Sequence, residues 1–361
     1  MSEYFDQRDI KNSEKIEEIL RNDLPDYCRE YFVGISMNTT SLTRLNYAYD
    51  IRTFFRYLVN KVYRFKGKST KEISLVDIEN LSPFEVEAYL NYVEIYRDAE
   101  GRIVKNSARG KSRKLAAIRS FVRYFIKKQL IRYNPTATID TPKLREKEII
   151  RLEGSEITTM MDVVDAPEGM SERQQKYLEN TKIRDLAIVG LLLGTGIRVS
   201  ELVGIDIEDV NFEDFSFVVT RKGGARVILY FSDEVAGYLY DYYALRVADE
   251  STKDNPALFL SLQKKRITTR AVENIVKKYS QIATPLKHIT PHKLRSTFGT
   301  QLYRNTGDIY VVADVLGHKD VNTTRRHYAA ITDDIRKRAS TKVSLYDTDD
   351  DQGGQQWKTQ Q

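Results

Sequence analysis

The chain has little of what disulfide and thiolate-metal chemistry require. Its 361 residues include one cysteine, Cys28, and four histidines. A single cysteine excludes a disulfide within the chain and leaves a zinc site built on thiolates nearly without ligands. The motifs HExxH and GxSxG are absent as well, so the sequence does not support zinc-protease or serine-hydrolase chemistry.

Nucleotide and metal binding also lack support. The triplet Gly-Lys-Ser occurs twice, but a phosphate-binding loop needs another glycine five positions before the glycine of the triplet, where Val62 and Lys105 stand. His288 and His292 have a helical i, i+4 spacing, but Pro291 between them disfavours a metal pair on one helix. We therefore expect neither a metal nor another cofactor.

Long hydrophobic runs are missing too. The most apolar stretch, residues 186–194, is far too short to cross a bilayer. The first residues, MSEYFDQRD, carry acidic groups where a signal peptide carries basic ones. Together with the single cysteine, these features predict a protein of the reducing cytoplasm, associated with the nucleoid if its partner is DNA, and no membrane partner.

The overall composition is that of a globular protein with more than one core. Hydrophobic residues make up 41% of the chain and charged residues 30%. A chain of this length seldom folds around a single core, so we expect two domains. The net charge of +6 is too small to identify a partner before the position of the excess is known.

Positive charge is concentrated in residues 102–151. This segment holds fifteen Lys and Arg residues against three acidic ones, so the rest of the chain is net acidic. Within it, apolar residues recur at helical spacing, while Arg119, Arg123 and Lys127 stand four apart on a neighbouring face. A solvated helix usually mixes charge signs, so this face favours contact with phosphates over simple solvation. The candidate phosphate-contacting residues of the helix are Arg109, Arg113, Lys114, Arg119, Arg123 and Lys127.

The N-terminal part has the pattern of an all-helical bundle. Apolar residues recur at helical spacing across residues 40–62, and Ser82 followed by Pro83 is typical of a helix N-terminus. The bundle is expected to end near Pro135 and Pro142, before a charged segment without a packing period. The predicted organisation is an N-terminal extension (1–23), a helical DNA-binding domain (24–142), a linker (143–152), a second domain with a C-terminal helix (153–346) and a disordered tail (347–361).

The second domain is expected to be helical with a small antiparallel sheet. The β-rich runs 215–220 and 225–231 flank a turn that contains two glycines, which is typical of a hairpin. Helical patterns surround this hairpin, and the stretch from residue 165 to 182 has the polar composition of a surface loop. The predicted fold class is therefore mainly α, with a helical first domain and a mixed second domain.

Basic and tyrosyl groups gather in four segments of the second domain. These segments contain Arg198, Lys222, His292 with Arg295, and His318 with Tyr328. Taken singly, each residue is most often an ordinary surface or structural group. Together they supply two guanidiniums to hold a phosphate, imidazoles and an amine to move protons, and a phenol to attack phosphorus.

The order and spacing of these residues resemble the tyrosine recombinase, or phage integrase, family. Lys222 follows Arg198 by 24 residues, and an HxxR box begins at His292. The next histidine follows the arginine of that box by 23 residues, and Tyr328 follows this histidine by 10. The resemblance covers the whole second domain, which then has the family's catalytic fold, and the basic helical first domain is similar to the family's core-binding domain.

The resemblance implies strand exchange on duplex DNA without a metal or ATP. Tyr328 would attack the scissile phosphate and form a 3′-phosphotyrosyl link with a free 5′-hydroxyl. Lys222 would be the general acid that protonates the leaving 5′-oxygen. Because the phosphotyrosyl bond conserves the energy of the cleaved linkage, the strand can be rejoined to a partner strand without an external energy source.

The same resemblance implies roles for the remaining residues. Arg198 and Arg295 would hold the phosphate, and His318 would hydrogen-bond one of its non-bridging oxygens. His292 would serve in proton transfer at the nucleophile. Glu201, which follows Arg198 by three residues and so shares its helical face, would orient the site from behind.

The family also implies an assembly. We expect paired inverted half-sites in the DNA and a homo-tetramer, or a tetramer with a related recombinase. Apolar residues that recur every four positions from Ile331 to Val343 predict a C-terminal helix, which would dock in trans on a neighbouring protomer.

The biological role stays open at this point. An Xer-like system is one reading, and integration or excision of a mobile element, or DNA inversion, is the alternative. The interval from His318 to Tyr328 is one residue longer than in many Xer and phage members and resembles integrases of conjugative transposons. A type IB topoisomerase, or an inactive DNA-binding accessory protein, fits the complete set of residues less well.

Overall fold

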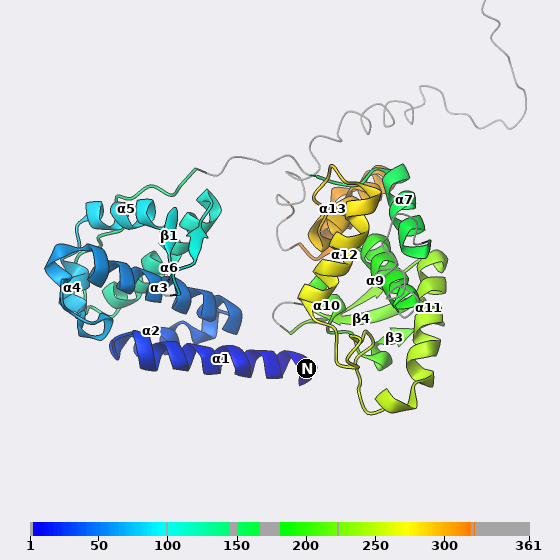
Figure 1. Ribbon diagram of the computed structural model, residues 1–361, viewed down its shortest axis with the longest axis horizontal. Coiled ribbons are helices and arrows are strands. Elements are labelled where there is room, and N and C mark those ends of the chain that lie inside the picture. Colours follow the sequence, from blue (N-terminus) through cyan, green and yellow to red (C-terminus); the bar gives the residue numbers. More distant parts are fainter. Residues whose placement is uncertain are drawn as a thin grey trace, which may run out of the picture. The chain divides into compact units, whose positions relative to one another are not determined.

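The protein folds as two compact units, Met1–Lys147 and Glu148–Gln361 (Figure 1). The computed structural model describes residues 3–98, 100–143, 150–166, 181–221, 224–318 and 321. Within these residues, no helix is long and apolar enough to span a bilayer. Each unit has its own hydrophobic core, and we describe the two separately.

The first unit consists mainly of helices. Its helices are α1 (Glu3–Asp23), α2 (Tyr27–Gly34), α3 (Ser41–Lys61), α4 (Leu75–Glu79), α5 (Pro83–Tyr92) and α6 (Ala108–Lys127). The helix predicted across residues 40–62 is α3, and the helix predicted in the basic segment is α6. The Ser82 hydroxyl accepts the Glu85 N–H at 3.3 Å, so Ser82 caps α5 as expected, with Pro83 in the first turn.

Two features of the first unit differ from the sequence prediction. Strands β1 (Ile95–Arg97) and β2 (Ile103–Lys105) form a short antiparallel hairpin, so the unit is not purely helical. The turn between them was missed because each strand has only three residues, too few to show a period of two. In addition, residues expected as an extension form α1, which packs on α3 and buries Ile16, Ile19 and Leu20.

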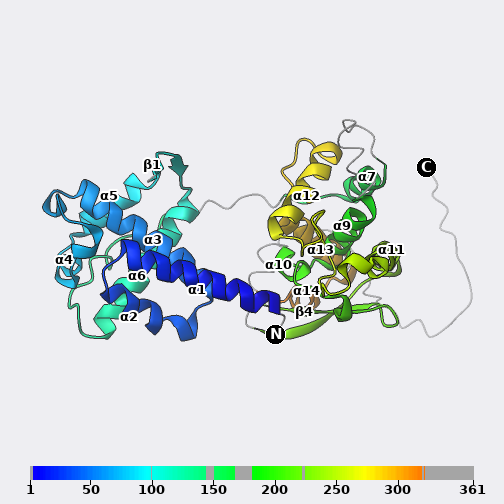
Figure 2. The same ribbon diagram turned by 60° about the horizontal axis from the view of Figure 1, so that its bottom comes forward.

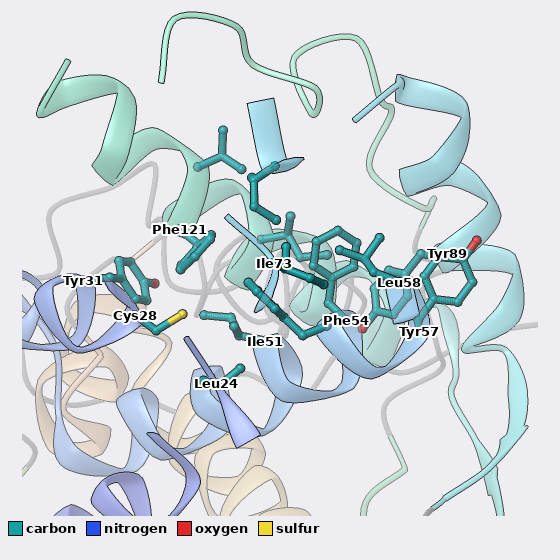
Figure 3. Packing of buried hydrophobic residues seen from close by; sticks show 14 of the residues in the cluster. Leu24, Cys28, Tyr31, Ile51, Phe54, Tyr57, Leu58, Ile73, Tyr89 and Phe121 are labelled. Atoms are coloured by element: carbon teal, nitrogen blue, oxygen red, sulfur yellow. The ribbon is translucent and has the colours of Figure 1, made fainter. Parts of the chain in front are cut away.

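Aromatic rings and aliphatic side chains fill the core of the first unit. Figure 3 shows Cys28 lying among Leu24, Tyr31 and Ile51, with its sulfur directed into the cluster. The thiol is free and fully buried, and burial raises its pKa. A thiol kept neutral and out of contact with solvent is a packing group and not a nucleophile.

A buried carboxylate joins α3 to α6. Asp50 of α3 is 1% exposed and accepts a hydrogen bond from the Lys114 Nζ at 2.9 Å and another from the Arg113 guanidinium. Burial raises the pKa of Asp50, and the two neighbouring cations lower it in turn. Lys114 itself is 5% exposed, so its ammonium neutralises Asp50 within the unit. The expectation that Lys114 contacts DNA is corrected here, because its charge is buried and paired.

The other basic residues of α6 have different surroundings. Arg119 donates to the Thr141 hydroxyl at 2.8 Å and to the Ile139 carbonyl, which fastens the segment after α6 to the helix. Arg109, Arg123 and Lys127 are exposed. The cationic face predicted from the sequence is therefore partly used for internal contacts and partly open to solvent.

The second unit combines helices with a small sheet (Figures 1 and 2). Its helices are α7 (Gly154–Asp165), α9 (Lys182–Thr195), α10 (Val199–Leu202), α11 (Asp233–Ala248), α12 (Thr269–Ala283), α13 (Pro291–Thr306) and α14 (Ile309–Leu316). The strands β3 (Val210–Asn211), β4 (Ser216–Thr220) and β5 (Arg226–Tyr230) pair in the order β3-β4-β5, all antiparallel. The predicted fold class, mainly α with a small antiparallel sheet, is confirmed.

The predicted hairpin is the pair β4 and β5. Their register runs from Ser216 opposite Tyr230 to Thr220 opposite Arg226. The ladder thus ends one residue before Arg221, whose N–H donates to the Ala225 carbonyl at 2.8 Å. Strand β3 is an addition that two residues could not reveal in the sequence.

Helix α9 is the apolar stretch of the sequence, and it lies in the middle of the unit in contact with α7, α11, α12 and α13. Asp185, in its first turn, is 1% exposed and binds the Tyr279 hydroxyl of α12 at 2.7 Å, the Lys278 Nζ at 3.2 Å and Arg184 at 2.8 Å. These bonds fix the start of α9 on α12. Its far end therefore reaches a defined place, just before Arg198.

Replacing Asp50 by alanine should destabilise the first unit strongly, because it leaves the Lys114 ammonium buried without a carboxylate. Breaking one side of a buried ion pair costs about 3–5 kcal/mol. Hydrogen exchange of the α3 and α6 amides measures this loss for the first unit alone. The matched control is Arg123→Gln, an exposed cation on the same helix, with an expected change below about 0.5 kcal/mol. Equal effects of the two substitutions would contradict the internal role of Lys114.

Candidate active site

The C-terminus of α14 is closed by a glycine in the left-handed conformation. Gly317 has a φ of +61°, its N–H donates to the Asp314 carbonyl at 2.8 Å, and the His318 N–H donates to the Ala313 carbonyl at 2.9 Å. This pair of bonds is the Schellman arrangement. It fixes the backbone of His318 and uses two of the carbonyls that the end of the helix leaves without partners.

Three arginines take the next three carbonyls of the same turn. Arg221 Nη2 donates to the Val315 carbonyl at 2.8 Å. Arg295 Nη2 donates to the carbonyl of Leu316, and Arg198 Nη2 donates to the carbonyl of Gly317 at 3.0 Å. Because the C-terminus of a helix carries partial negative charge, it attracts these cations and holds them close together despite their mutual repulsion.

Arg198 lies at the start of α10 and is held from two sides. Its Nη1 donates to Glu201 Oε1 at 2.6 Å, and its backbone N–H donates to Glu201 Oε2 at 3.1 Å. Glu201 is 4% exposed, whereas the Arg198 side chain is 36% exposed. The buried carboxylate of Glu201 and the Gly317 carbonyl thus hold the guanidinium while part of the Arg198 side chain stays open to solvent, and the orienting role of Glu201 stays a prediction.

Arg295 comes from the second turn of α13 and is 5% exposed. Its Nη1 donates to the Gly196 carbonyl at 2.6 Å, so the guanidinium joins the end of α9 to the end of α14. Gly196 has a φ of +60°, and a Cβ there would lie 2.4 Å from the Phe298 ring. The sequence Gly196 to Arg198 therefore turns the chain tightly from α9 into α10, where both arginines meet the same helix end.

The two candidate histidines lie on the elements that carry these contacts. His292 is exposed in the first turn of α13, three residues before Arg295, so the two share one side of the helix. His318 is half-buried and follows Gly317 directly. His288 precedes the helix, which begins at Pro291, and therefore does not form a helical pair with His292. Within the described residues, no group of three or more His, Cys, Asp or Glu is arranged to hold a metal.

Guanidinium binding to carbonyls is not by itself a sign of function. Arg246 binds carbonyls of Thr252, Asn255 and Ala257, and Arg266 binds those of Val203 and Ile205, each fastening a loop. The arginines at α14 differ because they come from three separate elements and meet on consecutive carbonyls. Arg198 among them is also open to solvent, so the cluster can receive an anion.

Two of the predicted site residues are not described by the structure, and one residue of the arginine cluster was not predicted. Lys222 and Tyr328 lie outside the described residues, as do the predicted C-terminal helix, the polar loop at residues 167–180 and the tail. Sequence reasoning missed Arg221. The residue directly precedes Lys222 in a basic turn, and the sequence does not indicate that its side chain, unlike that of an ordinary turn residue, reaches α14.

Comparison with known proteins supports the family resemblance described from the sequence. Residues 150–334 match the model of the Phage integrase family. The chain is 33% identical over 312 residues to Tyrosine recombinase XerC of Caldanaerobacter subterraneus subsp. tengcongensis, covering 83% of this chain and 80% of that protein. It is 30% identical over 356 residues to Tyrosine recombinase XerS of Streptococcus equi subsp. zooepidemicus, covering 91% of this chain and 98% of that protein.

Solved structures share the fold. The XerH site-specific recombinase bound to a palindromic difH substrate aligns with a TM-score of 0.62 at 18% identity, covering 84% of this chain and 80% of that one. The Tn1549 transposon integrase in complex with a circular intermediate DNA aligns with a TM-score of 0.61 at 17% identity, covering 88% and 99%. At these identities the alignments support the architecture, and the family match rests on the sequence comparisons.

Replacing Gly317 by alanine should destabilise the second unit more than the same change at Gly307. Both glycines end helices at positive φ, where a Cβ costs about 1–2 kcal/mol. A Cβ at Gly307 meets nothing within 4 Å, whereas a Cβ at Gly317 would lie 2.3 Å from Arg221 Nη1. Moving this guanidinium aside loses its hydrogen bond to the Val315 carbonyl, which should add about 1 kcal/mol to the loss. Urea denaturation followed by circular dichroism measures both variants, and equal losses would contradict the described packing.

Proposed function

This chain belongs to the phage integrase family and is a site-specific tyrosine recombinase, and on that premise we propose that Tyr328 cleaves its DNA. The tyrosyl oxygen attacks the scissile phosphate, so the 3′ end becomes linked to the protein and a 5′-hydroxyl is released. A 5′-hydroxyl of the partner strand then attacks the phosphotyrosyl bond and regenerates the tyrosine. Rejoining needs no ATP, because the energy of the cleaved bond is retained in the phosphotyrosyl link. Cationic side chains supply the charge stabilisation that a metal would otherwise give.

The observation that carries this proposal is the arginine cluster at the end of α14. In the proposed complex, Arg198 and Arg295 hold the non-bridging oxygens of the phosphate. A guanidinium has five N–H donors in a flat fork, so it can bind backbone carbonyls with some and direct others to phosphate. Because the carbonyls hold the guanidiniums before DNA arrives, little reorganisation is needed as charge builds up on the pentacovalent phosphorus.

The histidines are proposed to act beside this cluster. His318 follows the Schellman turn, where its backbone is fixed one residue from the carbonyl bound by Arg198. It donates a hydrogen bond to a non-bridging oxygen of the phosphate. His292, exposed on α13 one turn before Arg295, takes part in proton transfer at the tyrosyl oxygen.

Lys222 is proposed as the general acid for the leaving 5′-oxygen. The support is its place in the chain, directly after Arg221, whose side chain is bound to α14. An ammonium that gives its proton as the P–O bond breaks avoids the release of a costly alkoxide. The chemistry thus divides between two arginines for the phosphate, two histidines and a lysine for protons, and one tyrosine for the attack.

The open part of α6 is proposed as a phosphate-contacting surface of the first unit. Arg109, Arg123 and Lys127 are exposed, and part of Arg113 and Arg119 reaches solvent as well. Contacts of this kind neutralise phosphates and release counterions, which gives affinity without base specificity.

Target and assembly are proposed from the family relationship. The XerH neighbour is bound to a palindromic substrate, which supports paired inverted half-sites for this chain as well. We propose a tetramer on DNA, with itself or with a related recombinase, and a C-terminal helix that docks in trans. The similarity to XerC and XerS over most of the chain favours an Xer-like role over integration or excision of a mobile element.

The proposed mechanism is tested by trapping the covalent intermediate. A duplex selected by the protein from a random-sequence pool, and nicked beside the cleavage position, loses its short leaving strand and cannot be rejoined. Incubation in EDTA should give a protein-DNA adduct that maps to Tyr328. Loss of the adduct in Tyr328→Phe is expected, because a phenylalanine offers no oxygen.

The matched control is Tyr310→Phe, an exposed tyrosine of α14 outside the proposed site, which should form the adduct at the parent rate. An adduct that persists in Tyr328→Phe would show that another residue attacks. A requirement for a divalent metal would contradict the proposed chemistry of arginine, lysine and histidine.

A further inference from the structure

Arg221 is a half-buried cation that the assigned chemistry does not use. Its backbone closes the β4–β5 turn from both sides, since its N–H donates to the Ala225 carbonyl at 2.8 Å and its carbonyl accepts from the Gly224 N–H at 3.0 Å. Its side chain leaves the hairpin and donates from Nη2 to the Val315 carbonyl at 2.8 Å. The residue therefore connects the end of the hairpin ladder to the end of α14.

The guanidinium of Arg221 lies directly against the backbone of Gly317. A Cβ built on Gly317 would come within 2.3 Å of Nη1 and 2.4 Å of Cζ. Such an approach is possible only because glycine has no side chain. The carbonyl of the same glycine accepts from Arg198 at 3.0 Å, so Arg221 touches the peptide that positions a phosphate-binding guanidinium.

The placement of Arg221 satisfies a carbonyl at the end of α14 but also has an energetic cost. The Nε of Arg221 is buried without a hydrogen-bond partner in the described part of the chain. A third cation also lies on a helix end that already binds Arg198 and Arg295. A long apolar side chain could fill the same space without either penalty, although it would leave the Val315 carbonyl without this donor. A buried polar group without a partner calls for a specific reason.

We propose that Arg221 is a positioning residue for the general acid, an inference that rests on the proposed function of Lys222. Arg221 fastens the chain after β4 to α14, beside the Schellman turn that carries His318, and Lys222 is the next residue in the sequence. The guanidinium of Arg221 is directed to the Val315 carbonyl and the Gly317 backbone, so in this proposal Arg221 acts on the reaction through its neighbours and not by touching the phosphate.

The relevant chemical step is the departure of the 5′-oxygen. The bond from the tyrosyl oxygen to phosphorus forms, the bond from phosphorus to the 5′-oxygen breaks, and a proton passes from the Lys222 ammonium to that oxygen. When sulfur replaces the 5′-oxygen, the thiolate leaves without a proton because thiols are far more acidic than alcohols. A defect confined to the acid therefore disappears with the sulfur-containing DNA, whereas a defect in phosphate binding or folding remains.

The test compares cleavage of ordinary and 5′-thio DNA by Arg221→Met and Arg221→Lys. Methionine keeps an unbranched chain and removes the guanidinium, whereas lysine keeps the positive charge but lacks the planar set of N–H donors. We expect Arg221→Met to cleave ordinary DNA about 10²-fold more slowly, the lower range for losing general-acid catalysis. On 5′-thio DNA it should reach the parent rate within about threefold, and Arg221→Lys should show a smaller defect with the same rescue.

Two further variants make the result decisive. Arg226→Gln removes an exposed arginine of the same hairpin that binds Asp209 at 2.9 Å, and it should cleave both substrates at the parent rate. Lys222→Ala should be slow on ordinary DNA and rescued by sulfur. If Lys222→Ala is not rescued, the acid assignment fails and the inference fails with it.

If Lys222→Ala is rescued but the Arg221 variants stay slow on sulfur, the proposed function stands and the inference is overturned. Parent-like cleavage of ordinary DNA by Arg221→Met would overturn it equally. Circular dichroism and half-site binding of each variant show whether the fold is retained. If Arg221→Met does not fold, the comparison of ordinary and 5′-thio DNA is made with Arg221→Lys.

Discussion

Five consecutive carbonyls at the end of α14 need hydrogen-bond donors, and the way they obtain them organises the second unit. The backbone N–H groups of Gly317 and His318 satisfy the carbonyls of Asp314 and Ala313. Arginines from three other elements satisfy those of Val315, Leu316 and Gly317. The last carbonyls of a helix lack intrahelical partners and carry partial negative charge, so they bring together guanidiniums that would otherwise repel one another. The same residues that complete the helix thus form a cluster of guanidiniums, which we propose receives the scissile phosphate.

Each arginine is delivered by a different part of the fold. Asp185 fastens the start of α9, the tight turn at Gly196 follows its end, and Arg198 begins α10 immediately afterwards. Helix α13 contacts both α9 and α14 and supplies Arg295 (Figure 2). Strand β4 supplies Arg221 at its end. A change in any of these contacts would move a guanidinium, so the arginine cluster depends on the whole unit.

Much of this could be predicted from the sequence, but only where a pattern is local. The period of α3 and α6, the cap of α5 and the glycines between β4 and β5 are short-range signals, and each prediction was confirmed. Partners across the chain could not be predicted in this way. Lys114 has the position of a surface cation, yet it faces Asp50, which is 64 residues away. Arg221 has the sequence of a turn residue, yet it binds a carbonyl 94 residues away, and nothing in the local pattern marks either pairing.

The central claim is that the arginine cluster is assembled on the carbonyls of α14 before DNA binds. The most direct measurement is a pair of crystal structures, one of the protein alone and one with a selected half-site duplex. The account predicts that Arg198, Arg221 and Arg295 keep their carbonyl contacts in both, with the scissile phosphate on Arg198 and Arg295. Guanidiniums that leave the carbonyls to reach the phosphate, or a phosphate bound away from the end of α14, would contradict it.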